Sequence, residues 1–175
     1  MEILIFFRVL LLLGFICSSL YWVDWSKWQI YYPTMLFVIT VNLVASYLSY
    51  HHTLWLFHPD PLVTTHTVLN LLSTFSLLPL TALLFLSGFP SGRLKQLIHI
   101  TCWIVLYAAI EFVDEKLGGI SYLNGWSLWN SVFLDCAMFP LIALHHRQPL
   151  LAWFFTILVA AAVLIAFDFI NADMK

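Results

Sequence analysis

The stretch from Glu111 to Trp126 reads EFVDEKLGGISYLNGW and separates two long apolar runs. The run before it ends in three acids, Glu111, Asp114 and Glu115, and the run after it carries Asp135 near its middle. The Gly-Gly and Asn-Gly pairs between the runs are typical of turns. The pattern predicts two neighbouring helices joined by a short turn, with carboxylates inside and beside the hydrophobic segments.

The composition extends this prediction to the whole chain. Of its 175 residues, 62% are hydrophobic and 9% are charged, whereas a soluble domain has about 25% charged residues. A soluble fold of this length could not bury so much apolar surface, so we expect one membrane domain over residues 1–175, with the lipid bilayer as its partner. The net charge of −2 shows no basic excess for nucleic acid, and no cofactor motif is present, so we expect no cofactor.

Six segments have the roughly 20 mostly apolar residues that a spanning helix needs. The predicted fold class is therefore all-α, a polytopic membrane helix bundle with short loops. Pro33 and Pro149 are expected to open the second and sixth helices, because proline suits a first helical turn. The segments are about 3–23, 33–50, 64–87, 96–114, 126–144 and 149–169.

The basic residues predict an orientation. An even number of helices places both termini on one side of the membrane. Because Lys and Arg favour cytoplasmic loops, we expect a multi-pass protein of the cell membrane with both termini outside. The opposite side carries four of the seven basic residues: Lys27, Arg93, Lys95 and Arg147.

Tryptophan is concentrated near the predicted helix ends. This distribution favours an interfacial aromatic belt, and the alternative is an aromatic cage for a cationic ligand. The residues concerned are Trp22, Trp25, Trp28, Trp55, Trp126 and Trp129.

Polar side chains recur three or four residues apart on the second to fifth predicted helices, and this spacing places them on one helix face. We expect these four helices to share a polar interior, with the first and sixth helices facing lipid. The alternative role of such residues is interhelical hydrogen bonding. The candidates for substrate binding are Asn42, Asn70, Tyr107, Asp114 and Ser131.

Glu111 and Asp135 are the candidate acid or proton sites, catalytic if the protein is an enzyme. A charge at the centre of a spanning helix costs about 2.5–3.5 kcal/mol on insertion scales. Pro140 follows Asp135 by five residues and is expected to kink the helix beside it. The alternative for Asp135 is a neutral carboxylic acid, hydrogen-bonded across helices. His66 and Glu111 could contribute to a metal site, but no HxxxH or HExxH pattern is present, so no metal is predicted.

Several short motifs are similar to those of an uncharacterised family of small, multi-helix membrane proteins from endospore-forming Gram-positive bacteria. The motifs are Tyr-Pro-Thr at 32–34 with Asn42, Leu-Trp at 54–55, Glu111, Tyr-x-Asn-Gly-Trp at 122–126 with Ser131, and His-His-Arg-x-Pro at 145–149. The resemblance implies a plasma-membrane protein with several spanning helices, and it implies no activity.

Three functions fit these observations. The first is a small-solute or proton-linked carrier, or an accessory membrane subunit, with Glu111 and Asp135 at an intramembrane site for a small apolar or cationic ligand. The second is a membrane enzyme acting on a lipid or isoprenoid-like substrate, with Glu111 as general acid and His66 or Asp114 assisting. The third is a structural bundle that binds a membrane partner or forms a homo-oligomer.

Overall fold

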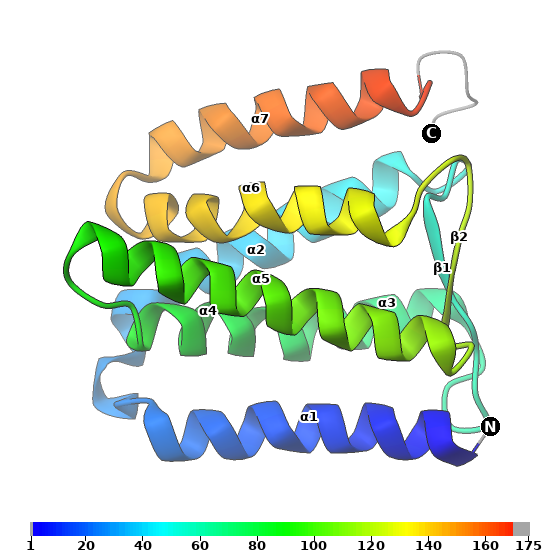
Figure 1. Ribbon diagram of the computed structural model, residues 1–175, viewed down its shortest axis with the longest axis horizontal. Helices are drawn as coiled ribbons and strands as arrows, with labels where there is room; N and C mark the ends of the chain where they lie inside the picture. The colour runs from blue at the N-terminus through cyan, green and yellow to red at the C-terminus, as the bar shows by residue number, and fades with distance from the viewer. Residues whose placement is uncertain (1, 170–175) are drawn as a thin grey trace.

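The computed structural model describes residues 2–169, and six helical segments in this range are long and apolar enough to cross a membrane. This confirms the all-α helix bundle and fits a multi-pass integral membrane protein. Figure 1 shows α1 beginning and α7 ending at the same end of the bundle. The six segments are α1 (Glu2–Trp22), η1 with α2 (Trp25–Lys27 and Trp28–Leu48), α3 with η2 and α4 (His66–Leu72, Ser73–Leu77 and Leu78–Ser87), α5 (Arg93–Lys116), α6 (Leu128–Arg147) and α7 (Pro149–Ala166).

The second helix begins earlier than Pro33. The side chain of Asp24 accepts the backbone N–H of Ser26 and caps the short helix η1, which runs directly into α2 at Trp28. Pro33 therefore lies inside α2, and the expectation that it opens the helix is wrong. This early start has a local cause, because an aspartate cap satisfies free N–H groups at a helix beginning. Pro149 does occupy the first position of α7, as predicted.

The third span contains one wider turn. In η2, which is a π-helix, the backbone N–H of Leu78 bonds to the carbonyl of Ser73, five residues earlier. Pro79 follows, and a proline ring in a regular helix clashes with the carbonyl four residues before it. The wider turn gives that carbonyl room. Such π-helical turns occur frequently at functional sites.

Two short strands, which the sequence did not predict, join the loops at one end of the bundle. β1 (Trp55–Phe57) pairs antiparallel with β2 (Ile120–Tyr122), with Trp55 opposite Tyr122. After β2 the chain reverses through Asn124 and Gly125, which both have positive φ, and the N–H of Trp126 bonds to the carbonyl of Leu123. Asn and Gly tolerate this conformation best. The turn directs Trp126 back toward the bundle.

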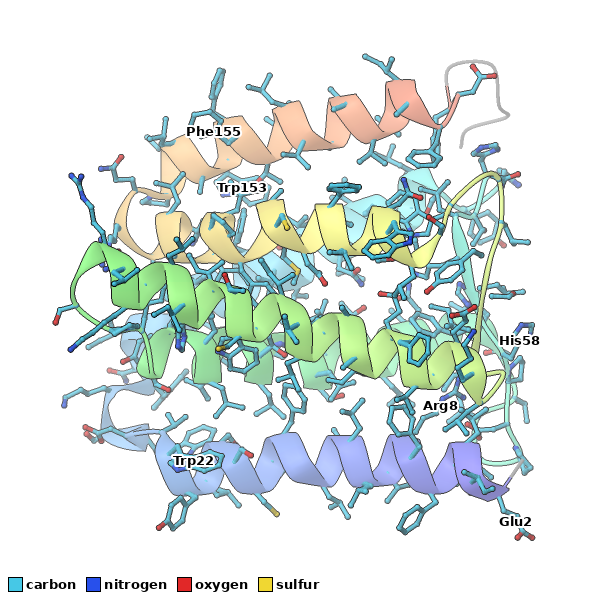
Figure 2. All side chains as sticks on the ribbon, viewed as in Figure 1. Glu2, Arg8, Trp22, His58, Trp153 and Phe155 are labelled. Carbon is cyan, nitrogen blue, oxygen red and sulfur yellow. The ribbon has the colours of Figure 1, made fainter. Side chains whose placement is uncertain are left out.

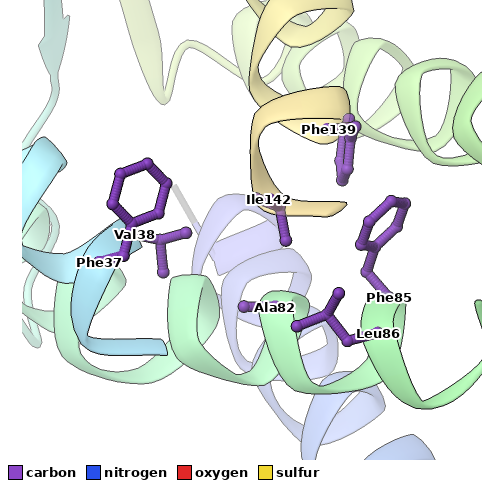
Figure 3. Close-up of a cluster of buried hydrophobic side chains, with 7 residues drawn as sticks. All are labelled: Phe37, Val38, Ala82, Phe85, Leu86, Phe139 and Ile142. Carbon is purple, nitrogen blue, oxygen red and sulfur yellow. The ribbon is translucent and has the colours of Figure 1, made fainter. Parts of the chain in front are cut away.

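The packed core lies toward the other end. α2 contacts α4 and α6, α5 packs on α6, α7 packs on α6, and α1 packs on α4. Three phenylalanines, Phe37, Phe85 and Phe139, are buried where α2, α4 and α6 meet. Figure 3 shows them with Val38, Ala82, Leu86 and Ile142. Because Phe85 and Leu86 end α4, this cluster fills the half of the bundle away from the sheet.

Candidate functional site

A cavity of about 380 Å³ lies at the sheet end of the bundle. Its walls come from α1, α2, the α3–η2–α4 span, α5, α6 and the loops that carry β1 and β2. It is lined by both candidate acids and by all five candidate binding residues: Asn42, Asn70, Tyr107, Glu111, Asp114, Ser131 and Asp135. The structure thus brings together side chains from four different spans.

Glu111 stands at the centre of a hydrogen-bonded chain. Its Oε1 accepts a 2.8 Å hydrogen bond from the hydroxyl of Tyr122 and a 2.5 Å hydrogen bond from the hydroxyl of Ser131. Ser131 in turn accepts the indole Nε1–H of Trp126 at 2.9 Å. Within residues 2–169 both hydrogen bonds to Glu111 go to Oε1 and none goes to Oε2, and Glu111 lines the cavity.

Asp135 has a different environment. Its side chain comes from the first half of α6, about 10 Å along the helix axis from Leu128, and the residue is 8% exposed. Within the described part of the chain, its carboxyl group has no hydrogen-bond or ion-pair partner. The predicted hydrogen bond across helices is therefore not seen. A buried acid inside a membrane-spanning helix is a candidate functional residue.

Arg8 holds the sheet end of the cavity together. Its guanidinium donates to Asp60 Oδ2 at 2.8 Å, to the carbonyl of His58 at 3.1 Å and to the carbonyl of Gly119 at 2.9 Å. Its Nε lies 3.7 Å from Asp114 Oδ1. Figure 2 shows Arg8 at the same end of the molecule as His58. One side chain of α1 thus ties together the two loops that carry the strands.

Two ionisable groups of these loops are strongly influenced by their neighbours. Burial alone would raise the pKa of Asp60, but the backbone N–H groups of Val63 and Leu62 and the guanidinium of Arg8 bring it below its ordinary value. Burial, with the adjacent Glu111, raises the pKa of the Tyr122 phenol. Asp60 is therefore a stable anion, and Tyr122 remains a hydrogen-bond donor at neutral pH.

Amides and hydroxyls connect α2 to the third span beside the cavity. Asn42 Nδ2 donates to Thr74 Oγ1 at 2.6 Å, and Asn70 Nδ2 donates to Ser46 Oγ at 2.8 Å. These bonds confirm the alternative role of such residues, interhelical hydrogen bonding. Asn42 and Asn70 still line the cavity, so the same side chains bind helices together and present polar atoms to the interior.

Aromatic rings form much of the remaining wall. Trp126 is 6% exposed, lines the cavity, and packs on Trp55 with 5.2 Å between ring centroids. These two tryptophans therefore turn inward, because the paired strands fold them over the helix ends. Trp22 and Trp129, by contrast, are exposed on the outside. Further rings on the cavity wall are Phe7, Phe15, Phe57 and Tyr107.

His66 is engaged elsewhere. Its Nδ1 accepts the backbone N–H of Phe57 at 2.9 Å, and its ring stacks on that of Phe57. It is not among the residues that line the cavity. No group of three or more His, Cys, Asp or Glu side chains within residues 2–169 is arranged to hold a metal ion. The pairing of His66 with Glu111 that an acid–base or metal site would need is not formed.

Arg8 and Tyr122 are site residues that were not predicted from the sequence. Arg8 did carry a signal, because a charged residue inside an apolar helix usually faces a polar partner in the protein interior. α1 was expected to face lipid, yet it contributes Ile5, Leu12 and Phe15 as well as Arg8 to the cavity wall. Tyr122 carried no signal of its own, because its position depends on the pairing of two distant loops.

Comparisons of the chain with family models, with curated proteins and with solved structures found no match. The function is therefore argued from the cavity and the side chains that line it.

Proposed function

We propose that this protein is a carrier of the cell membrane that binds a small, largely apolar organic cation in the cavity at the sheet end. One observation carries the proposal: Glu111, Asp114 and Asp135, three acids of the spanning helices, line the same cavity. Arg8 is the only Lys or Arg among its described lining residues, and it is already paired with Asp60 and Asp114. A bound cation would supply a positive charge for the acids that Arg8 does not pair, Glu111 and Asp135.

The size and wall of the cavity fit such a ligand. Small-molecule sites are usually clefts of about 300–1,000 Å³ with mostly apolar walls and a few polar groups. This cavity of about 380 Å³ has leucines and aromatic rings around its acids. Rings such as Trp55 and Trp126 attract organic cations through the negative faces of their π systems. The aromatic cage considered from the sequence is thus supported by the inward position of these two tryptophans.

The three acids lie at successive depths from the sheet end, and this arrangement suggests a path for a cation. Counting along each helix from the sheet end, Asp114 comes first, Glu111 about one turn deeper and Asp135 about 10 Å into α6. Carrier sites are commonly near the membrane midplane, beside spanning helices with irregular turns. The π-helical turn η2 is such an irregularity, and its Ser73 and Ser76 line the cavity. A cation could therefore move from one acid to the next.

The distribution of basic residues supports an extracellular mouth for this path. Lys27, Arg93, Lys95 and Arg147 lie at the end of the bundle away from the sheet, and the positive-inside rule favours the cytoplasm for that end. The acidic sheet end then faces outward, where it would attract cations from the medium.

Uptake by proteoliposomes tests the proposal. Vesicles containing the purified protein, with an inside-negative potential, should accumulate radiolabelled tetraethylammonium in a saturable manner. Asp135→Asn should reduce uptake about tenfold or more, because a buried charge partner of a cation is worth about 2–5 kcal/mol. Glu111→Gln should also reduce it.

Asp24→Asn is the matched control, because Asp24 is an exposed acid that pairs with Lys27 and does not line the cavity. Its uptake should equal that of the wild type. Two results would contradict the proposal: uptake no greater than that of protein-free vesicles, or an Asp135→Asn protein of normal size-exclusion profile that transports like the wild type.

A further inference from the structure

A second cavity, of about 230 Å³, lies between α2, α6 and α7. Its wall is almost entirely hydrocarbon, with side chains such as Val41, Ala137, Leu141 and Val163. Within the described residues no charged side chain lines it. A cavity of this composition suits an alkyl chain better than a charged group.

The two cavities are neighbours that share part of their walls. Five residues line both of them and form the partition between them: Asn42, Trp55, Leu78, Trp126 and Leu134. They come from α2, β1, α4, the loop before α6 and α6 itself. Side chains change rotamer far more readily than helices move, so a change in the side chains of the partition would connect the cavities without a change of fold.

We infer that the two cavities are the two compartments of one ligand site, and that the ligand is an organic cation carrying a hydrocarbon chain. The cationic group occupies the acidic cavity near Glu111 and Asp135. The chain passes the partition at Trp126 and Leu134 and fills the apolar cavity. This inference rests on the proposed function and adds to it the chemical class of the substrate.

The partition is connected to the acidic compartment. The indole of Trp126 donates to Ser131, and Ser131 donates to Glu111. On the other side, Trp126 packs against Phe167 with 4.8 Å between ring centroids. A cation that draws the carboxylate of Glu111 toward itself would loosen the hydrogen bond that holds the indole. Binding of the cationic group thus favours opening the way for the chain.

A series of alkyltrimethylammonium ions tests the two compartments independently. The affinities of tetramethylammonium and of propyl-, butyl- and hexyltrimethylammonium would be measured by displacement of radiolabelled tetraethylammonium from the protein in phosphatidylcholine nanodiscs. For the wild type, each added methylene that enters the apolar cavity should increase affinity about fourfold, the factor that corresponds to burial of one methylene. Ala137→Phe fills that cavity, and it should abolish this increase while leaving tetramethylammonium affinity unchanged.

Ala162→Phe is the control, because Ala162 is exposed on α7 and does not line either cavity. It should keep the full dependence on chain length. Ala45→Phe fills the apolar cavity from α2 and serves if the Ala137 variant does not fold. The same chain-length dependence in wild type and in a folded, filled variant would overturn this inference alone. Failure of the wild type to bind even tetramethylammonium would overturn the proposed function and this inference with it.

Discussion

The hydroxyl of Ser131 donates a 2.5 Å hydrogen bond to Oε1 of Glu111, and this bond joins the two helices on either side of the Glu111–Trp126 stretch. The same hydroxyl oxygen accepts the indole N–H of Trp126. Ser131 therefore holds the carboxyl group of Glu111 and the indole of Trp126 in place. Through the bond to Glu111 it also connects α6 to α5. The contacts around this residue lead to the first prediction.

Ser131→Ala should destabilise the fold by about 1–3 kcal/mol, because it leaves the buried Nε1–H of Trp126 without a partner. Thermal unfolding in nanodiscs, followed by tryptophan fluorescence, would measure the loss. Ser26→Ala is the matched change at an exposed serine that bonds only to Asp24, and its midpoint should remain near that of the wild type. Equal midpoints for the two variants would contradict the role assigned to Ser131.

Thr74→Val should lower the free energy of unfolding by about 0.6 kcal/mol and by no more than about 1.7 kcal/mol, the average and the maximum for hydrogen bonds between spanning helices. Thr74 is fully buried and accepts a hydrogen bond from the side-chain amide of Asn42. Valine has the same shape as threonine but cannot accept this bond. Thr40→Val provides the comparison, because Thr40 is exposed and bonds only to Leu36 of its own helix. If denaturation in mixed micelles showed the two variants to be equally stable, the bond between α2 and η2 would not contribute to stability.

Asp60 should make the stability depend on pH at acid values. Its folded pKa is below its ordinary value of about 3.9, so its ionised form stabilises the fold above that pH. The contribution is lost as the pH falls through the folded pKa. At neutral pH, Asp60→Asn should lower the free energy of unfolding by about 1.5–3 kcal/mol, as expected for the loss of hydrogen bonds to a charged group.

The measurement is the difference in unfolding midpoint between wild type and Asp60→Asn from pH 3 to pH 7. We expect a constant difference from pH 5 to pH 7 and a smaller one below about pH 4. A difference that did not change over the whole range would show that the Arg8–Asp60 pair does not require an ionised carboxylate.

Gly119→Ala should destabilise the loop that carries β2 by about 1–3 kcal/mol, the usual cost of overpacking. A Cβ atom at this position would overlap the carboxyl group of Asp114 and the side chain of Leu4. Gly14→Ala is the control, since a Cβ atom there meets no neighbour within 4 Å. Comparison of the two midpoints in a thermal-shift experiment checks the prediction, and equal stability would show that Asp114 can move away at little cost.

Much of the helical architecture could be predicted from local patterns. Runs of about 20 apolar residues predict spanning helices, and all six were found. The spacing of Asn42, Tyr107, Glu111 and Ser131 on their helices correctly indicated which faces turn inward, because the helical period is set by backbone geometry alone. The site prediction failed at Arg8, Tyr122 and Trp126. Their roles depend on loops, which have no such period.

Hydropathy and helical periodicity act over neighbouring residues, so the number of helices and the acids that they carry into the bundle can be predicted from local sequence. That these acids share one cavity is a property of the tertiary fold. Arg8 meets Asp60 and Gly119 across 52 and 111 positions of the chain, and β1 meets β2 across a similar distance. Such contacts depend on the mutual packing of all the helices, and no local stretch of sequence identifies the partners of Arg8 or of β1.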